Sequence, residues 1–131
     1  MKKTILLVDN EIDVQNRYFL QAGYDVLVAH DGKEGLELFR KKSIDLIITD
    51  IMMPNMNGYD FISEVQYIAP NQPFLFTTAK TSEQDKIYGL SLGGYDFIAK
   101  PFSLHELVLR VNNILRRLAV EVRQSGSILV T

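Results

Sequence analysis

Apolar and polar residues follow two patterns along this chain. Short uninterrupted apolar runs, of which Ile5–Val8 is the clearest, are typical of strands that are covered on both faces of a parallel sheet. Between these runs lie longer stretches in which apolar residues recur about once per helical turn. The runs predict five strands, at about residues 4–8, 25–29, 45–49, 73–77 and 96–99.

The stretches between the runs carry start and stop signals for helices. Asp31-Gly32 opens a helix that extends to about Lys41, and Gly23 closes the helix before it. Thr81–Gln84 and Ser103–Glu106 have the spacing of capping boxes, and Gly93-Gly94 ends the helix that the first of them begins. The last helix repeats apolar residues one turn apart, at Leu107, Val111, Ile114 and Leu118. Strands that alternate with helices predict a doubly wound α/β domain with helices on both faces.

The pattern loosens after Arg117. Gln124–Ser127 has the composition of a linker, and residues 127–130 fit either the start of another strand or a tail. We therefore assign residues 1–118 to one domain and residues 119–131 to a linker or the start of a further domain.

Composition excludes several classes of protein. The net charge of −2 argues against binding to nucleic acid or membranes that is driven by charge. The chain has no Cys, and His30 and His105 are too far apart for a zinc motif. No apolar stretch approaches the ~20 residues that span a bilayer. The sequence therefore predicts a soluble, cytoplasmic, single-domain protein.

Polar residues stand where the predicted strands end. Asp9, Asn10 and Glu11 follow the first strand, and Asp50, Thr78 and Lys100 follow the third, fourth and fifth. Because the carboxyl ends of parallel strands share one edge, these side chains should converge. Carboxylates within ~4–6 Å of one another resist joint ionisation unless a cation neutralises them, and oxygen ligands favour Mg²⁺. Such a site suits phosphoryl transfer, in which a carboxylate can be the nucleophile.

Each of these residues also has an ordinary structural explanation. A single Asp at a strand end is usually a solvated turn residue or a helix cap, and a single Lys is usually a surface residue. Glu11 is best explained as a first-turn residue that complements the helix dipole. The convergence of complementary charges on one edge favours the site.

Four motifs in order resemble the receiver domain of two-component response regulators. They are Ile5–Asp9, Leu46–Gly58, Thr77–Ala79 and Ala99–Phe102, and the resemblance covers residues 3–118. It implies a flavodoxin-like sheet of strand order 2-1-3-4-5.

The resemblance also implies a role for each site residue. Asp50 would accept a phosphoryl group from a sensor histidine kinase. Asp9, Asp50 and the backbone carbonyl of Met52 would hold Mg²⁺ or Mn²⁺. Lys100 would pair with the phosphorylated carboxylate, and Thr78, followed by the small residue Ala79, would bond a phosphoryl oxygen. Phe97 would turn inward as the aromatic switch, although plain core packing is the simpler interpretation of this residue.

A finer resemblance points to regulators that carry a winged-helix DNA-binding domain. In these, Lys86 with Glu106 and Asp96 with Arg110 would form ion pairs across a homodimer face made by the fourth helix, fifth strand and fifth helix. The simpler explanation is four solvated charges, worth ~0–1 kcal/mol per pair. DNA would be bound only through an effector domain outside this chain, and residues 119–131 would lead to it.

The sequence departs from the family pattern in three places. Asn10 replaces a second acid, so it would contact the metal weakly or through water, and we expect weaker Mg²⁺ binding. Asp9 and Gly23 are 14 positions apart, which shortens the first helix by about one turn, ~3.6 residues. Tyr95 replaces an acid that is common in the winged-helix subfamily.

Two other functions stay open at this point. Asn10 and the short helix could mark a pseudo-receiver that is an interaction module without phosphorylation. An aspartate-nucleophile phosphatase or a flavin- or nucleotide-binding protein would share the architecture. The phosphatase pattern needs an acid where Met52 stands, and no Gly-rich phosphate loop follows the first strand.

Overall fold

Five parallel strands form one sheet in the order β2-β1-β3-β4-β5, as the resemblance predicts. The computed structural model describes residues 2–9, 13–79, 87–88, 90–93, 97–100 and 102–130. The strands are β1 (Thr4–Val8), β2 (Asp25–Ala29), β3 (Leu46–Asp50), β4 (Phe74–Thr78) and β5 (Phe97–Ala99). The helices are α1 (Asp13–Gln21), α2 (Gly32–Lys41), α3 (Gly58–Ile68) and α5 (Leu104–Val130), and residues 87–88 and 90–91 are also helical.

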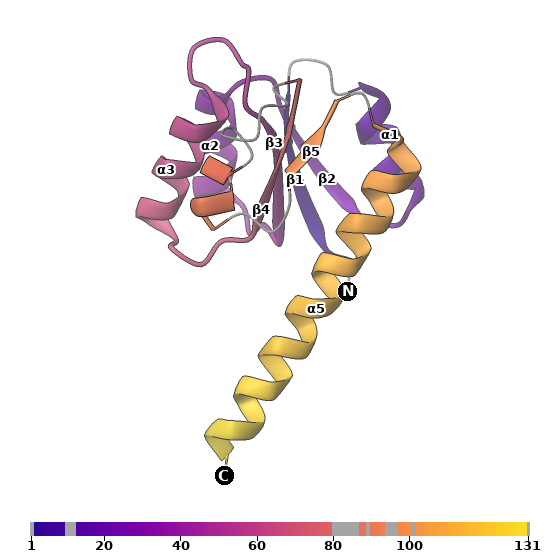
Figure 1. The fold of residues 1–131 in the computed structure, drawn as a ribbon, viewed down its shortest axis with the longest axis vertical. Coiled ribbons are helices and arrows are strands. Elements are labelled where there is room, and N and C mark those ends of the chain that lie inside the picture. The colour runs from indigo at the N-terminus through magenta and orange to yellow at the C-terminus, as the bar shows by residue number, and fades with distance from the viewer. Residues whose placement is uncertain are drawn as a thin grey trace.

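Helices cover both faces of the sheet, with α2 and α3 on one side and α1 and α5 on the other (Figure 1). All four residues of Ile5–Val8 are 0% exposed. Successive side chains of this strand enter opposite layers: Ile5 and Leu7 pack with α1 and α5, whereas Leu6 and Val8 pack with α2 and α3. The uninterrupted apolar run thus corresponds to a strand buried on both faces.

Several predicted helix ends lie where the sequence places them. Asp31 caps α2, since its Oδ1 accepts from the Glu34 amide at 2.9 Å. Gly23 and Gly93 adopt positive φ angles of 97° and 96° after their helices, a conformation that glycine adopts without strain. The Ser103 hydroxyl accepts from the Glu106 amide at 3.3 Å. The capping box predicted at residues 81–84 lies outside the described residues.

Strands β3 and β4 begin one residue later than predicted. The Asp45 carboxylate accepts from the Thr4 amide at 2.8 Å, so this side chain is used to fix the edge of the sheet rather than to extend the strand. Pro73 has no amide hydrogen to donate, and its carbonyl accepts from Ile47 just before the strand begins. As a result Asp50 and Thr78 are the last residues of their strands instead of the first residues beyond them.

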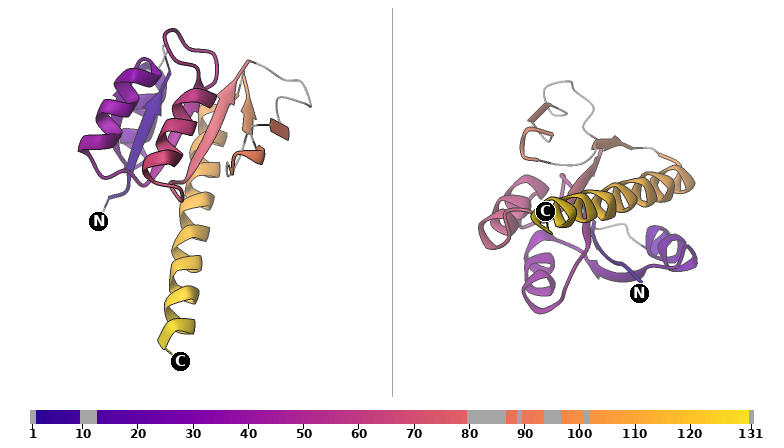
Figure 2. Two further views of the ribbon diagram at one scale, coloured as in Figure 1. Left: turned by 90° about the vertical axis from the view of Figure 1, so that its left-hand side faces the viewer. Right: turned by 90° about the horizontal axis from the view of Figure 1, so that it is seen from below.

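The last helix is longer than predicted. It continues past residue 118 to Val130, and its C-terminal part extends away from the sheet (Figures 1 and 2). Of the two alternatives for residues 127–130, the start of another strand is wrong, because these residues are helical. The stretch contains no proline, and a single Gly126 costs a helix only about 1 kcal/mol. The assignment of residues 119–131 to a linker or to the start of an effector domain stays a prediction.

Candidate functional site

The C-terminal edge of the sheet gathers polar residues from four strands. Asp9 follows β1, Asp50 ends β3, Thr78 ends β4 and Lys100 follows β5. Asp9, Asp50 and Thr78 are 2%, 5% and 0% exposed. These three polar side chains are thus buried at the edge where parallel α/β sheets bind their ligands.

Lys100 joins the two carboxylates. Its Nζ donates to Asp9 Oδ2 at 2.9 Å and to Asp50 Oδ2 at 3.1 Å, and its side chain is 26% exposed. Burial disfavours the ammonium, but the hydrogen bonds to Asp9 and Asp50 and the negative charges of these residues together outweigh it and raise the pKa of Lys100. One fixed positive charge therefore faces two buried carboxyl groups.

Asp50 is held by the start of the loop that follows it. The Met52 amide donates to Asp50 Oδ1 at 3.2 Å, while Oδ2 faces Lys100. Burial raises the pKa of the Asp50 carboxyl, although the hydrogen bond and charge of Lys100 oppose this effect. The Asp50 carboxyl group is thus partly desolvated, with one oxygen beside a fixed ammonium and the other held by a backbone amide.

Gly58 is required by the close approach of the β3–α3 loop to the site. A Cβ at this position would lie 2.2 Å from the Asp50 carbonyl oxygen and 2.9 Å from Ile51 Cα. The Gly58 amide donates to the Ile51 carbonyl at 2.9 Å and closes the base of the loop. The backbone of Asp50 and the start of α3 therefore touch with no room for a side chain.

Comparison with known proteins decides the family. Residues 5–112 match the response regulator receiver domain. The chain belongs to this family. The receiver domain is 45% identical over 117 residues to response regulator SaeR of Staphylococcus aureus (strain USA300), covering 87% of this chain and 51% of SaeR. It thus spans about half the length of the curated relatives it matches.

Solved structures support the same assignment. The non-phosphorylated HemR receiver domain from Leptospira biflexa is 32% identical with a TM-score of 0.81, covering 87% of this chain and 94% of that one. The receiver domain of the Francisella response regulator 1452 is 33% identical with a TM-score of 0.83, covering 89% and 99%. The resemblance inferred from the four sequence motifs is confirmed.

In the described part of the receiver domain, the buried carboxylates of Asp9 and Asp50 are available to a metal ion. Within the described residues no group of three or more His, Cys, Asp or Glu side chains could hold a metal. Asp9 and Asp50 provide oxygen donors of the kind Mg²⁺ prefers, and this ion commonly takes one or two carboxylates and keeps several waters. The two carboxylates therefore fit Mg²⁺. Asn10, the third predicted ligand, lies outside the described residues.

The predicted switch residues are placed as follows. Thr78 is fully buried, its carbonyl accepts from the Lys100 amide at 2.7 Å, and Ala79 is exposed. Phe97 is 8% exposed and packs against Phe76 with ring centroids 6.5 Å apart. The resemblance predicts an inward turn of Phe97 on activation, but the ring already lies inward in this structure.

Sequence reasoning missed a series of aromatic contacts that starts at Phe97. Phe76 also contacts Tyr59 of α3 at 5.3 Å, and Tyr59 contacts Tyr88 at 4.7 Å, both edge to face. Tyr88 is 50% exposed. The rings therefore connect the predicted switch residue to the surface through α3, a relation that sequence spacing does not reveal.

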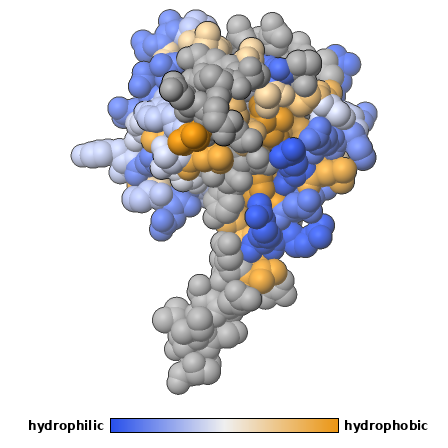
Figure 3. All heavy atoms as spheres, in the orientation of Figure 1, coloured by the Kyte–Doolittle hydropathy of each residue, from blue (hydrophilic) through white to orange (hydrophobic). Residues whose placement is uncertain are grey.

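The predicted dimer face is described only in part. Glu106 and Arg110 form an ion pair with each other at 3.0 Å along α5, and Lys86 and Asp96 lie outside the described residues. Apolar residues gather around β5 and residues 87–88 and 90–91, and hydrophilic and apolar residues are interspersed along α5 (Figure 3). Ile87, Leu90 and Leu109 are 59%, 40% and 48% exposed.

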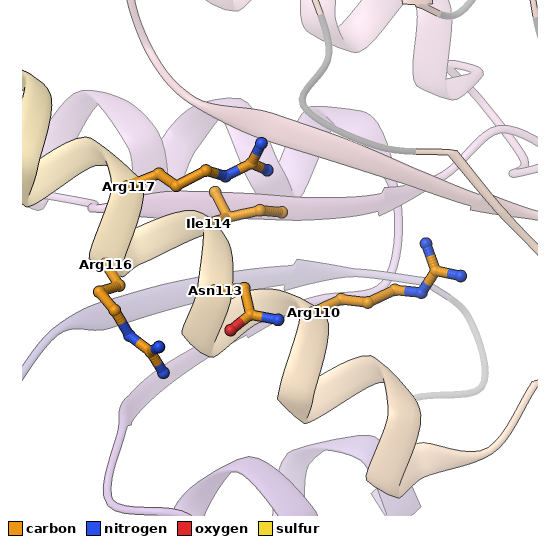
Figure 4. Close-up of a pocket in the computed structure, with 5 residues that line it drawn as sticks. All are labelled: Arg110, Asn113, Ile114, Arg116 and Arg117. Carbon is orange, nitrogen blue, oxygen red and sulfur yellow. The ribbon is translucent and has the colours of Figure 1, made fainter.

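An open pocket of about 480 Å³ lies on the same helix. Arg110, Ile114 and Arg117 extend to one side of α5, while Arg116 points away from them (Figure 4). The side chains that line this pocket all come from α5. Among the described residues no helix, α5 included, is both long enough and apolar enough to cross a membrane.

Proposed function

We propose that this receiver domain accepts a phosphoryl group on Asp50 from the phosphohistidine of a sensor histidine kinase. An Asp50 carboxylate oxygen attacks phosphorus, and the P–N bond breaks with its electron pair going to the imidazole nitrogen. The observation that carries the proposal is the position of Lys100, which lies within hydrogen-bond distance of both Asp50 and Asp9. Transfer of this kind depends mainly on positioning and on charge neutralisation.

Asp9, Asp50 and the Met52 carbonyl would hold Mg²⁺, with Asn10 as a weak or water-mediated ligand. When bound, Mg²⁺ supplies positive charge that stabilises the oxygens of the transferring phosphoryl group. Lys100 would keep its contact with Asp50 and donate to the new phosphoryl group. The hydroxyl of Thr78, one strand away, would donate to another phosphoryl oxygen. Hydrolysis of the acyl phosphate would be slow, because the apolar side chain of Met52 cannot orient the attacking water molecule.

Phosphorylation would then shift a two-state equilibrium at the surface formed by residues 87–88 and 90–93, β5 and α5. The aromatic contacts from Phe97 through Phe76 and Tyr59 to Tyr88 support a physical route from the predicted switch residue Phe97 to that surface. The exposed Ile87, Leu90 and Leu109 support homodimerisation there, with Lys86, Asp96, Glu106 and Arg110 as the surrounding charges.

The output is proposed to be transcription, through a winged-helix domain that belongs to the same protein. The supporting finding is the 45% identity to a response regulator of about twice this length. A cytoplasmic location is part of the proposal. The reading frame that follows residue 131 in the natural gene tests it, since a different kind of domain there would contradict the transcriptional output.

Phosphorylation itself is tested by mass. The protein is incubated with acetyl phosphate and Mg²⁺ and its intact mass is compared with that of Asp50→Asn and of Asp60→Asn, a matched change on the exposed start of α3. We expect the wild type and Asp60→Asn to gain one phosphoryl group and Asp50→Asn to gain none. No gain in the wild type would instead support the pseudo-receiver.

A further inference from the structure

The loop that joins β3 to α3, residues 51–57, is tied to the start of α2 by a hydrogen bond between two side chains. We propose that Asp31 and Asn55 are positioning residues, which hold this loop so that the Met52 carbonyl faces a Mg²⁺ ion bound by Asp9 and Asp50. This inference rests on the proposed function, because it assigns an outer support to the metal site proposed there.

Asp31 uses both of its carboxylate oxygens. Oδ1 accepts from the Glu34 amide at 2.9 Å and caps α2, and Oδ2 accepts from Asn55 Nδ2 at 2.9 Å. These hydrogen bonds, with that from Glu34 the stronger influence, lower the pKa of Asp31 below its ordinary value. The carboxylate is therefore ionised at neutral pH, and it links two elements that are 24 positions apart.

Asn55 adopts a conformation that most residues avoid. Its φ is 68°, the only positive φ of a non-glycine residue in the described part of the chain. Asn tolerates this region better than most residues, but the conformation still persists only where its surroundings hold it. The hydrogen bond to Asp31 supplies that support at the tip of the loop.

The rest of the loop is fixed at its base. The Gly58 amide donates to the Ile51 carbonyl at 2.9 Å, and the Met56 amide donates to the Pro54 carbonyl at 2.7 Å. Met56 packs so closely on α2 that a Cβ at Gly32 would lie 2.9 Å from its Cγ. A short loop fixed at its base and tip leaves the Met52 backbone little freedom to turn.

The placement of Met52 connects this loop to the site. Its amide donates to Asp50 Oδ1 at 3.2 Å, so the backbone of Met52 begins directly beside the acceptor carboxylate. Groups that orient metal ligands from outside the first coordination shell commonly change metal affinity about 10–100-fold when they are removed. Loss of the Asp31–Asn55 bond should therefore weaken Mg²⁺ binding even though neither side chain touches the metal.

Two substitutions separate this role from a purely structural one. Asn55→Gly removes the hydrogen bond but keeps the positive φ accessible and changes no charge. Asp31→Ser keeps a hydroxyl that can cap α2 but loses the second oxygen. Asn71→Gly makes the same change as Asn55→Gly in the loop before β4, at the opposite edge of the sheet, and serves as the matched control.

The readout is the Mg²⁺ dissociation constant from calorimetry, measured on the four proteins and on the Asp31→Ser/Asn55→Gly double variant. Urea unfolding in EDTA checks that all five are folded. We expect each single variant at positions 31 and 55 to bind Mg²⁺ about tenfold more weakly, the double variant to match the weaker single variant, and Asn71→Gly to match the wild type.

Equal Mg²⁺ affinity of the wild type, Asp31→Ser and Asn55→Gly would overturn the inference and leave the proposed function standing. Additive losses in the double variant would also overturn it, because residues that act through one contact cannot be additive. A wild type that binds no Mg²⁺ would contradict the proposed metal site first, and the inference with it.

Discussion

Lys100 Nζ lies 3.1 Å from Asp50 Oδ2, although 50 positions separate the two residues in the sequence. The same nitrogen lies 2.9 Å from Asp9 Oδ2. The ammonium therefore stands between two carboxyl groups that would otherwise face each other in a site with little water. Removal of this one side chain should expose how strongly the two acids repel each other.

We predict that Lys100→Met destabilises the metal-free domain by about 2 kcal/mol. Removal of one partner of a fully buried ion pair costs about 3–5 kcal/mol, and the cost here is smaller because the Lys100 side chain is 26% exposed. Mg²⁺ should then stabilise the variant more than it stabilises the wild type, since the ion replaces the lost positive charge. Urea unfolding with EDTA or with Mg²⁺ measures both effects. Lys41→Met removes an exposed lysine at the other end of α2 as the control, and an equal response to Mg²⁺ in wild type and Lys100→Met would contradict the prediction.

Asp50 should make the stability of the metal-free domain depend on pH. Burial raises the pKa of its carboxyl above the ordinary value of 3.8, with Lys100 opposing. Ionisation of Asp50 is therefore harder in the folded state than in the unfolded chain. The resulting loss of stability is absent below pH 3.8, grows as the pH rises through the raised pKa of the folded state, and is constant above it.

Asp50→Asn cannot ionise, so in EDTA it should gain stability relative to the wild type as the pH rises from about 4 to about 8. The measurement is the difference in the free energy of unfolding between the two proteins, which cancels the titration of groups that do not interact with Asp50. At the higher pH, saturating Mg²⁺ should instead make Asp50→Asn less stable than the wild type, because the ion binds the Asp50 carboxylate and stabilises only the wild type. A difference that does not change with pH in EDTA would show that the Asp50 pKa is not raised.

Gly58→Ala should lower the free energy of unfolding by about 2–3 kcal/mol, because the three atoms nearest to the added Cβ all belong to the backbone and cannot rotate away. It should also weaken Mg²⁺ binding, since Asp50 and Ile51 must shift. Gly23→Ala is the comparison: nothing lies within 4 Å of its Cβ, and it pays only the cost of a positive φ, about 1–2 kcal/mol. Unchanged Mg²⁺ affinity in Gly58→Ala would contradict the close approach described for the site.

The parts of the fold that the sequence predicts well are those fixed by burial on two faces. Ile5–Val8 is apolar throughout because each residue enters one of the two cores, so the strand has the predicted bounds. The meeting of Asp9, Asp50 and Lys100 follows from one topological rule, that parallel strands end at a common edge. Neither inference needs any knowledge of how individual side chains pack.

Features that depend on contacts between distant elements could not be predicted. Asp31 is recognisable as a helix cap, but its second bond, to Asn55, depends on the path of a loop 24 positions away. The contact of Tyr59 with Tyr88 depends on how α3 is rotated about its axis. The later starts of β3 and β4 depend on Asp45 bonding to β1 and on Pro73 lacking a donor, and both are tertiary effects.

Asn10→Asp tests the one departure from the family pattern that concerns metal binding directly. We expect the variant to bind Mg²⁺ about tenfold more tightly or better. Two opposite unit charges about 4 Å apart attract each other by about 4 kcal/mol at the effective dielectric constant near a protein surface, and the divalent ion would be attracted more strongly. Much of this gain is offset by the cost of desolvating the groups and by repulsion among the acids in the metal-free state. The same repulsion should make the variant less stable than the wild type in EDTA.

Calorimetric titration of Mg²⁺ into the wild type and Asn10→Asp decides the matter. Asn71→Asp adds the same charge at the opposite edge of the sheet and should leave the affinity unchanged. Equal affinities for the wild type and Asn10→Asp would mean that position 10 does not approach the ion. In that case the two carboxylates of Asp9 and Asp50 would be the acidic side chains that determine the strength of the site.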